Sequence, residues 1–321
     1  MFIYLDIVDE FACEMCGSCC RNNWMVTLDA DSYQRNYELF MKTGRNEEFP
    51  KIFKRLTDDS GLGEYAYIEK KTSGGCWFLA ENNRCALQRE AGHHHLDHVC
   101  QIYPRYPMDT TRGTELTLSF SCPAVIRLAS RIAPLTIIRS ERSPIPIITN
   151  SEVVHIYPEQ QTACNPLRFY FEIEQHFIDI MQYRRMLIGE RLQLINETAR
   201  TINRFTKDCS LGQQLNDLFR VNYEYMDEKG LTSQETKVYI PDILLENFFM
   251  NFIFKKPFYI YGLQCTIQLL ESIWQRIENA RKVVADPKFD MECTKSTIME
   301  VEFEYSHNRR ALFAKSKDTL R

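Results

Sequence analysis

The segment from Cys13 to Cys20 constrains the fold more than any other part of the chain, because it holds four cysteines within eight residues. Two-residue spacers let successive sulfurs converge on one ion or cluster, and Gly17 permits the tight turn that this convergence needs. The adjacent Cys19 and Cys20 cannot form a disulfide without severe strain, so we predict that the run binds metal. If these two neighbours point to opposite sides, they can serve two different sites.

The placement of the other cysteines separates the chain into two parts. Eight of the 12 cysteines lie in the first 122 residues, and four are scattered over the rest. A dense set of thiols in a reducing compartment favours metal binding over disulfides. The predicted metal ligands are Cys13, Cys16, Cys19, Cys20, Cys76, Cys85, Cys100 and Cys122. The later cysteines are interpreted as buried hydrophobic residues in helices, and they are Cys164, Cys209, Cys265 and Cys293.

The cysteine pattern leaves the metal open between two chemistries. Four thiolates suit zinc and iron–sulfur clusters alike. Eight cysteines suit two four-ligand sites, or one site with additional redox or structural thiols. The spacing of Cys13, Cys16 and Cys19 is of the ferredoxin type, which favours an iron–sulfur cluster, with zinc as the alternative.

Composition and charge exclude several classes of protein. With 44% hydrophobic and 26% charged residues among 321, the chain is globular rather than disordered or collagenous. The net charge of −4 gives no global electrostatic reason to bind nucleic acid or an anionic membrane. The N-terminus lacks the basic segment of a secretory signal, and the apolar stretch 243–254 is shorter than the roughly 20 residues that span a bilayer. We therefore expect a cytoplasmic protein without membrane insertion, in which residues 243–254 form a buried core helix.

Hydrophobic periodicity predicts a mixed first half and a helical second half. The predicted elements of the first half are a helix over 30–43 with Asp29 as N-cap, a strand over 63–69, a hairpin between Cys76 and Cys85, a strand over 116–121 and a helix that opens at Pro123. Later helices are predicted over 190–206, 212–226, 241–255, 262–285 and 295–316. We therefore predict an α+β fold with a cysteine-cluster domain over residues 1–135, a connecting segment over 136–163 and a mainly α-helical domain over 164–321.

A series of short motifs extends from the cysteine run through the first 135 residues. The motifs are Phe11-x-Cys13-x-x-Cys16-x-x-Cys19-Cys20, Trp24-x-Val26-x-x-Asp29, Cys76-x-Phe78-Leu79, Cys85, Gly92, Cys100, Tyr103-Pro104-Arg105 and Glu115-x-x-Leu118-x-x-Ser121-Cys122-Pro123. The series resembles the flagellin lysine-N-methylases called FliB. Its cysteine core is also similar to the YkgJ-type cysteine-cluster domains, which are proposed zinc or iron chelators. A weaker similarity extends to residues 245–255.

The resemblance implies an enzyme that uses S-adenosylmethionine to methylate lysine side chains of flagellin. It also implies that the cysteines hold an iron–sulfur cluster, with [4Fe–4S] favoured. The sequence departs from ordinary methyltransferases, because its 12 glycines are scattered and form no glycine-rich turn between a strand and a helix. The CxxxCxxC motif of radical S-adenosylmethionine enzymes is also missing, since Asn23 stands where the third cysteine would follow Cys16 and Cys20.

Tyr103 and Arg105 are the candidate cofactor-binding residues. Both closely follow Cys100. The Arg105 guanidinium can bind the carboxylate of a methionine-derived cofactor or donate to cluster sulfides, and a fold-stabilising ion pair is the alternative role. Methylation needs a neutral lysine amine, so the site must desolvate the ammonium or pass its proton to a carboxylate or phenol. The sequence assigns no residue to that catalytic step.

Two polar clusters are interpreted as solvent-exposed. His94 and His98 are four residues apart, as paired metal ligands on a helix are, but a polar turn is the favoured interpretation of this histidine-rich segment. The arginine cluster is interpreted as a solvated face, and it comprises Arg127, Arg131, Arg139 and Arg142.

The residues alone leave two functions open besides the methylase. One is a zinc-binding or iron–sulfur protein, for electron transfer, without methylase activity. The other is a partner-binding helical protein in which the metal is a structural staple. Methyl transfer from S-adenosylmethionine to flagellin separates the methylase from both alternatives.

Overall fold

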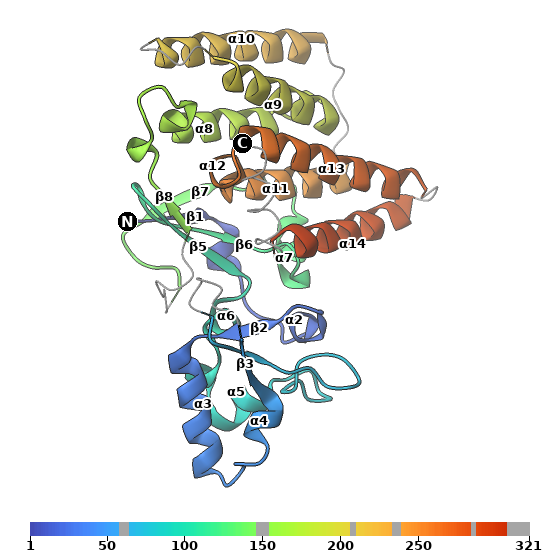
Figure 1. The fold of residues 1–321 in the computed structure, drawn as a ribbon. Helices are drawn as coiled ribbons and strands as arrows, with labels where there is room; N and C mark the ends of the chain where they lie inside the picture. The colour runs from blue at the N-terminus through green and yellow to red at the C-terminus, as the bar shows by residue number, and fades with distance from the viewer. Residues whose placement is uncertain (58–63, 146–153, 206–209, 233–238, 284–286, 307–321) are drawn as a thin grey trace.

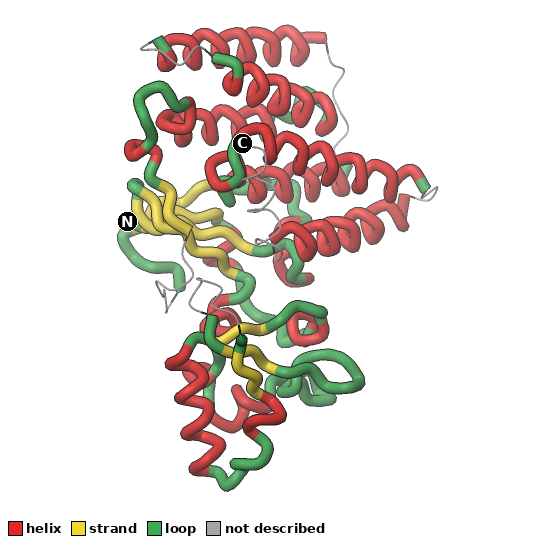
Figure 2. Tube along the Cα trace, in the orientation of Figure 1, coloured by secondary structure: helices red, strands yellow, loops and turns green. Residues whose placement is uncertain are grey.

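The computed structural model describes residues 1–57, 64–145, 154–205, 210–232, 239–283 and 287–306. The fold is α+β, as predicted, with a five-stranded sheet, a three-stranded sheet and a helical C-terminal half. Figure 1 shows the C-terminal helices stacked beyond the larger sheet, and the smaller sheet in a separate lobe. Figure 2 shows the same division by secondary structure, with the strands gathered in two places.

The larger sheet has the strand order β7-β1-β6-β5-β8. Its strands are β1 (Phe2–Leu5), β5 (Arg105–Thr110), β6 (Gly113–Leu118), β7 (Ile137–Ser140) and β8 (Val154–Ile156). β5 and β6 form an antiparallel hairpin, whereas β1 runs parallel to β6 and β8 runs parallel to β5. Gly113 at the hairpin turn has a φ of 127°, and a Cβ there would lie 2.2 Å from the Met1 carbonyl oxygen. This position therefore requires glycine.

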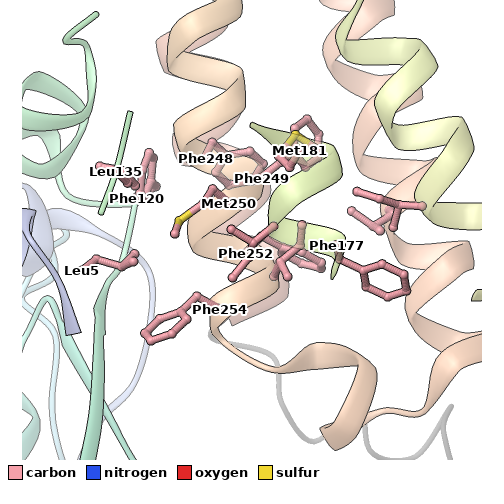
Figure 3. Packing of buried hydrophobic residues seen from close by; sticks show 14 of the residues in the cluster. Leu5, Phe120, Leu135, Phe177, Met181, Phe248, Phe249, Met250, Phe252 and Phe254 are labelled. Atoms are coloured by element: carbon pink, nitrogen blue, oxygen red, sulfur yellow. The ribbon is translucent and has the colours of Figure 1, made fainter. Parts of the chain in front are cut away.

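The C-terminal half is built around one helix that is buried on all sides. Its helices are α8 (Tyr170–Met181), α9 (Ile188–Asn203), α10 (Leu211–Thr232), α11 (Ile240–Phe254), α12 (Pro257–Ile260), α13 (Leu263–Lys282) and α14 (Pro287–Ser306), preceded by the 3₁₀ turns η3 (Pro158–Gln160) and η4 (Pro166–Phe169). Every residue of α11 from Ile243 to Phe254 is buried. Figure 3 shows α11 between Phe177 of α8 and the side chains of Leu5 and Phe120. The predicted core helix is therefore confirmed.

The polar residues within α11 attach this helix to its neighbours. Asn247 donates to the Ala129 carbonyl at 2.8 Å, and Asn251 donates to the Leu118 carbonyl at 3.0 Å. Glu246 accepts hydrogen bonds from Arg184 and Arg191, and the shortest contact from each arginine is 2.8 Å. Each of these buried side chains therefore has a partner, which offsets part of the cost of burying it, although Asn251 Oδ1 accepts no hydrogen bond within the described residues.

The smaller lobe holds an antiparallel sheet of order β2-β4-β3. Its elements are β2 (Val26–Leu28), α3 (Ala30–Lys42), α4 (Phe49–Ile52), β3 (Phe53–Arg55), β4 (Ala66–Ile68), α5 (Ala86–Ala91), η1 (His93–His95) and α6 (His98–Ile102). The Asp29 side chain accepts a hydrogen bond from the Ser32 amide at 2.6 Å, which confirms it as the N-cap of the predicted helix. Phe40, Phe49 and Phe53 pack edge-to-face or stacked in the centre of this lobe.

Two hydrophobic cores divide the described residues differently from the predicted boundary at residue 135. The larger core joins β1, β6 and α7 (Pro123–Ala129) to the C-terminal helices. The smaller core contains buried residues between Val26 and Leu96. Strands β7 and β8 come from the predicted connecting segment 136–163, yet they belong to the larger sheet. The smaller lobe is thus an insertion into the larger fold, because β1 precedes it and pairs with β6, which follows it.

Several predicted elements differ from the structure at their ends. The hairpin expected between Cys76 and Cys85 is present but short: Leu79 bridges Cys85 in antiparallel fashion, and the Ala86 amide donates to the Phe78 carbonyl at 2.7 Å, whereas Cys76 bridges Lys70. The strand expected over 116–121 is β6, which begins earlier and ends at Leu118, before the turn that leads to α7. The helix expected over 295–316 is α14, and residues 307–316 lie outside the described residues. Among the helices of the described residues, none has the length and apolarity that crossing a membrane requires.

Candidate metal centre

Separate parts of the chain bring the predicted thiol ligands toward one another. Cys13 and Cys16 precede the short helix α2 (Ser18–Arg21), and Cys19 and Cys20 lie within it. Figure 1 shows α2 and α6 near β2, at the end of the smaller lobe that faces the larger sheet. The other predicted ligands lie in the middle and at the end of the β4–α5 loop, in α6 and directly before α7, and they are Cys76, Cys85, Cys100 and Cys122. The Cys76 amide donates to the Cys20 carbonyl at 2.7 Å, which attaches the β4–α5 loop to α2.

Gly17 gives the cysteine run its turn, as the sequence predicted. Its φ of 72° is in the left-handed region, where glycine is favoured. A Cβ at this position would lie 3.0 Å from Arg21 Nη1 and 3.3 Å from the Asn83 Cβ. Arg21 uses this space to donate to the Cys16 carbonyl at 2.9 Å and to the Asn83 side chain. The turn, α2 and the loop near residue 83 are therefore held together around the thiols.

Cys19 and Cys20 place their sulfurs on the same side of α2. The two Sγ atoms are 3.9 Å apart, so the neighbours do not point to opposite sides. Two thiolates on one tetrahedral zinc ion, with bonds near 2.3 Å, would be separated by about 3.8 Å. The hydrogen bond with Cys20 lowers the pKa of Cys19 to about 7, and the same bond raises the pKa of Cys20. Cys19 is therefore the thiol that ionises most readily in this pair, as a metal ligand must.

Burial and mutual charge link Cys20 with the thiols of the smaller lobe. Burial raises the pKa of Cys76 and of Cys85, and it raises the pKa of Cys100 well above its ordinary value. Charges on Cys76 and Cys100 also raise the pKa of Cys20, beyond the larger effects of the Cys19 hydrogen bond and burial. The raised pKa values favour the neutral thiols in the absence of a metal. A bound cation would favour the thiolate forms instead.

The remaining thiols lie near Cys19 and the larger fold. Burial raises the pKa of Cys122 to about 11, and the charges of Cys16 and Cys19 contribute to that rise. Cys13 is exposed and lies close enough to Arg105 for its charge to act on the guanidinium. All eight predicted ligands therefore interact electrostatically with a neighbour at this junction or, for Cys13, with Arg105.

The thiols do not surround a common point in this structure. Among the described residues, no three histidine, cysteine, aspartate or glutamate side chains are placed to hold one metal ion. Binding of one ion therefore requires side-chain rotations. The donor set still fits a thiophilic group, because sulfur ligands select zinc and iron–sulfur clusters. A second observation agrees with a missing cation: both carboxylate oxygens of the buried Asp97, beside these thiols, accept no hydrogen bond from any other described residue.

Arginines of α7 and the following loop hold the segment that precedes the cysteine run. Arg127 donates to Glu14 at 3.0 Å. Arg131 donates to Glu10 at 2.8 Å and also pairs with Asp6. Arg127, Arg139 and Arg142 are exposed, as the interpretation of a solvated face predicts, whereas Arg131 is half-buried. Arg127 and Arg131 also pair with acidic residues more than 110 positions earlier in the chain. The sequence could not predict these pairs, because the partners are too far apart along the chain for any local pattern to link them.

Tyr103 and Arg105 lie at the same junction as the thiols. Trp24 packs edge-on against Tyr103, with ring centroids 5.2 Å apart, and stacks on Phe303 of α14. Burial raises the pKa of Tyr103, and the charges of Cys122 and Cys19 contribute. Arg105 lies over the Phe11 ring at 5.0 Å, and its buried Nε has no hydrogen-bond partner among the described residues. The predicted alternative of an ion pair for Arg105 has no counterpart among the described side chains.

A chain of hydrogen bonds connects Tyr103 to the C-terminal helices. The Tyr103 hydroxyl lies 3.1 Å from Ser121 Oγ, which lies 2.8 Å from Ser119 Oγ. Ser119 donates to Glu302 of α14 at 3.1 Å, and Glu302 also pairs with Lys255. Sequence reasoning missed Ser119, Glu302 and Lys255, since the partners lie up to 183 positions apart.

The other cysteines and the histidines take varied positions. Cys265 is buried in α13, as predicted, and Cys293 is half-buried in α14. Cys164 is exposed in a loop, so its interpretation as a buried helical residue is wrong, and Cys209 lies outside the described residues. His94 and His98 belong to η1 and α6, so they do not share one helical face.

Three curated proteins are similar to parts of this chain. Lysine-N-methylase of Salmonella typhimurium (strain LT2) is 28% identical over 164 residues, which are 49% of this chain and 39% of that protein. Lysine-N-methylase of Salmonella choleraesuis matches with the same identity and coverage. Flagellar biosynthetic protein FliU of Salmonella muenchen is 27% identical over 120 residues, which are 37% of this chain and 70% of that protein.

The similarity confirms the resemblance to FliB-like lysine-N-methylases over about half of the chain. The matched segment spans 39% of the length of those two methylases. No family model matches the chain, and no solved structure matches it.

Proposed function

We propose, from this similarity to the lysine-N-methylases, that the protein is an S-adenosylmethionine-dependent lysine N-methyltransferase that acts on flagellin in the bacterial cytoplasm. The proposal includes an iron–sulfur cluster held by the cysteines, with [4Fe–4S] favoured over zinc. Its main support is the coincidence of two observations: a junction rich in thiols, and similarity over half of the chain to proteins named lysine-N-methylase. The similarity to the flagellar biosynthetic protein FliU supports the flagellar connection.

The thiols at the junction are the residues that would hold the metal group. When bound, such a group supplies the positive charge that neighbouring thiolates need and, in the iron case, a centre for electron transfer. The pair Cys19 and Cys20 has the sulfur separation of two ligands that share a metal. Arg127 and Arg131 keep the cysteine run against α7 through their acidic partners. Arg105, with an unsatisfied buried Nε, fits a donor to a cluster sulfide or to a cofactor carboxylate.

Tyr103 is suited to orient the reactive groups rather than to act as a phenolate base. Methyl transfer requires a neutral lysine amine, whereas free lysine has a pKa near 10.4. Because burial raises the pKa of Tyr103, its phenol stays protonated at neutral pH. Its hydroxyl is positioned by Ser121 and, through Ser119, by the carboxylate of Glu302. We therefore assign Tyr103 a positioning role, which a Tyr103→Phe variant tests through its effect on the pH profile of methylation.

Protein purified without oxygen gives the first test of this function. The measurements are iron, zinc and acid-labile sulfide per chain, the visible absorption spectrum, and transfer of labelled methyl groups from S-adenosylmethionine to flagellin. We expect iron with matching sulfide, a broad visible band that fades on reduction, and labelled lysine in flagellin. Absence of transfer by metal-loaded protein would contradict the methylase proposal.

Two cysteine variants make the test specific to the junction. Cys19→Ser removes the most acidic thiol of the predicted set, and we expect it to lose metal and methyl transfer together. Cys265→Ala changes a buried cysteine of α13 and serves as the matched control, with metal content unchanged. Equal metal content in both variants would remove Cys19 from the ligand set.

A zinc-binding or iron–sulfur protein without methylase activity is the second candidate. The thiol-rich junction favours it independently of any methyl-transfer chemistry, because sulfur donors alone explain metal binding. Zinc without sulfide, together with no methyl transfer, would support a structural staple. Iron and sulfide with reversible bleaching but no transfer would support an electron carrier.

A further inference from the structure

Asp97 is buried without a partner beside the thiols. Its side chain is 1% exposed, and neither carboxylate oxygen accepts a hydrogen bond from another residue in the described ranges. A buried carboxylate without hydrogen bonds or a cation costs several kcal/mol in a folded protein. Native structures rarely keep such a group, so each one requires an explanation.

The two ordinary roles of a buried aspartate are not taken up by Asp97. The residue precedes α6 at the N-cap position, but its side chain makes no capping hydrogen bond to the helix. The nearest cation with an electrostatic effect on it is Arg35, whose Nη2 donates instead to the Leu96 carbonyl at 3.1 Å and to Ser32 at 3.0 Å. Burial outweighs the charge of Arg35 and raises the pKa of Asp97 to about 7, so near neutral pH the carboxylate is open to a proton or to another positively charged group.

The other neighbours of Asp97 identify the chemistry of that group. The charge of Asp97 acts on the thiols of Cys76, Cys85 and Cys100, which come from the β4–α5 loop and from α6. One carboxylate and three thiols are all anionic ligands once they lose their protons. The charge of Arg35 acts on Asp97 and that of Lys70 on Cys76, but neither cation makes a hydrogen bond to the Asp97 carboxylate. Oxygen and sulfur donors both bind zinc and iron.

We propose that Asp97 is an oxygen ligand of a metal centre whose sulfur ligands are Cys76, Cys85 and Cys100. The proposal rests on the metal centre of the proposed function and adds a residue that the cysteine pattern did not include. The four side chains do not surround one point in this structure, so they would have to rotate toward the ion. Binding would form one metal–oxygen and three metal–sulfur bonds, and each thiol would release its proton to solvent. The Cys13–Cys20 run with Cys122 is then a separate, all-sulfur set. Asp97 would dissociate from the metal more readily than the three cysteines, because carboxylates bind soft metals more weakly than thiolates.

Asp97→Asn separates this role from a structural one. The substitution keeps the shape and removes the charge. We expect the metal-free protein to be as stable as the parent or more stable, because an uncompensated buried charge is lost. We expect the metal content per chain to fall by the amount that one of the two centres binds. We also expect a chelator to remove zinc at least about 10-fold faster, as happens when a group that supports a metal is lost. Asp31→Asn, in the exposed first turn of α3, is the control and should leave both properties unchanged.

Asp97→Cys tests the ligand role in the opposite direction. With cobalt(II) titrated into metal-free protein as a spectroscopic probe, a fourth thiolate should strengthen the sulfur-to-cobalt charge-transfer band and retain the metal. A band unchanged from the parent would mean that position 97 does not reach the metal. Circular dichroism on the metal-free variants establishes that they are folded, so that metal loss is not a consequence of unfolding.

The outcomes separate the Asp97 inference from the metal centre itself. If the parent protein binds neither iron, zinc nor cobalt, the proposed metal centre fails and the inference fails with it. If the parent binds metal and Asp97→Asn binds it with the same content and dissociation rate, the metal centre stands and the inference is overturned. If Asp97→Asn lowers the stability of the metal-free protein with metal binding intact, Asp97 is a structural partner of Arg35 instead.

Discussion

Two regions of the molecule bury charged side chains, and they satisfy them in opposite ways. One is the ion cluster of Lys256, Glu115, Glu174 and Arg112, where the sheet meets the helices. The other is the thiol junction with Asp97 at the end of the smaller lobe. The first is complete within the chain, whereas in the second Asp97 accepts no hydrogen bond from another described residue and burial raises the pKa values of the neighbouring thiols.

The ion cluster pairs two cations with two carboxylates. Lys256 is 0% exposed, and its Nζ lies 2.7 Å from Glu115, 2.8 Å from Glu174 and 3.0 Å from the Phe254 carbonyl. Arg112 bridges the same two carboxylates at 2.9 and 2.8 Å. Burial alone would raise the pKa of Glu115, but the Lys256 ammonium and the Arg112 guanidinium lower it below its usual value. Burial has the opposite net effect on Glu174 and raises its pKa, although Lys256 and Arg112 act against it. The cluster links β6, α8 and the corner between α11 and α12.

The difference shows which region depends on something outside the chain. The Lys256 ammonium is bonded to Glu115, Glu174 and the Phe254 carbonyl, so adding a ligand there would bring no benefit. At the junction, the buried Asp97 carboxylate has no hydrogen-bond partner when it is ionised, and a bound cation would offset that cost. We interpret the ion cluster as part of the structure and the junction as a binding site.

Removal of the metal tests the difference between the two regions most directly, and it has the largest expected effect on stability. In small zinc domains the metal contributes on the order of 10 kcal/mol to folding. We therefore expect a chelator to destabilise the smaller lobe strongly, while α11 and the ion cluster keep their stability. Hydrogen exchange measured by mass spectrometry should show loss of protection in peptides from residues 24–100.

The location of the change decides the outcome of the chelation experiment. Peptides of α11 are the internal control, because this helix is buried in the larger core. Uniform loss of protection across both cores would show that the lobe and the larger fold unfold as one unit. No loss in residues 24–100 would mean that the junction is complete without metal.

Removing one ion from the complete cluster gives the next largest effect. Lys256→Met keeps the side-chain length but leaves two buried carboxylates with Arg112 alone. Breaking a buried pair in this way costs about 3–5 kcal/mol, so the urea midpoint of the larger core should fall sharply. Position 256 has a φ of 63° in the parent, and methionine carries the same backbone strain as lysine there, so the loss reports on the charge.

An exposed pair provides the matched control for Lys256. Arg220 and Glu224 of α10 pair at 2.9 Å, and their side chains are 63% and 60% exposed. Glu224→Gln should change stability by less than about 0.5 kcal/mol, because solvent already screens the pair. If Lys256→Met lowers the stability as little as Glu224→Gln does, the buried ion cluster contributes no more to stability than an exposed pair.

The local features of both regions were predictable from the sequence. The spacing of the cysteine run indicated a tight turn at Gly17, and the structure has it. Asp29 and Pro123 marked the starts of α3 and α7, because capping and the fixed φ of proline act within a few residues. The apolar composition of residues 243–254 indicated a buried helix, and α11 is buried throughout that range.

The long-range features could not be predicted in the same way. β1 pairs with β6 across more than 100 residues, so the position of the smaller lobe as an insertion left no periodic signal. Lys256 and Glu174 are 82 positions apart, and each looks like an ordinary surface charge in the sequence. Asp97 has the sequence signature of a helix cap, and only the fold shows that its carboxylate does not cap α6.

The smallest expected effect is the loss of stability at acid pH. It extends the comparison to a single buried group in the helical half of the molecule. His176 of α8 is 1% exposed, and its Nε2 lies 2.9 Å from the Asn222 side chain of α10. Burial lowers the pKa of His176 to about 4 from the ordinary 6.5. The unfolded chain therefore binds a proton more readily than the folded one between these values. Stability from the neutral imidazole is complete above pH 6.5 and is lost as the pH falls toward 4.

Over this pH interval the free energy of unfolding falls by about 3 kcal/mol. Urea unfolding of the larger core at pH 7 and at pH 4.5 measures it, with His176→Gln as the control that cannot titrate and still offers an acceptor to Asn222. We expect the parent to lose more stability than the variant between the two pH values. Equal losses would mean that the protonated imidazole is accommodated where it lies. His176 would then share the property of the ion cluster, a buried charge satisfied from within the chain, rather than that of the thiol junction.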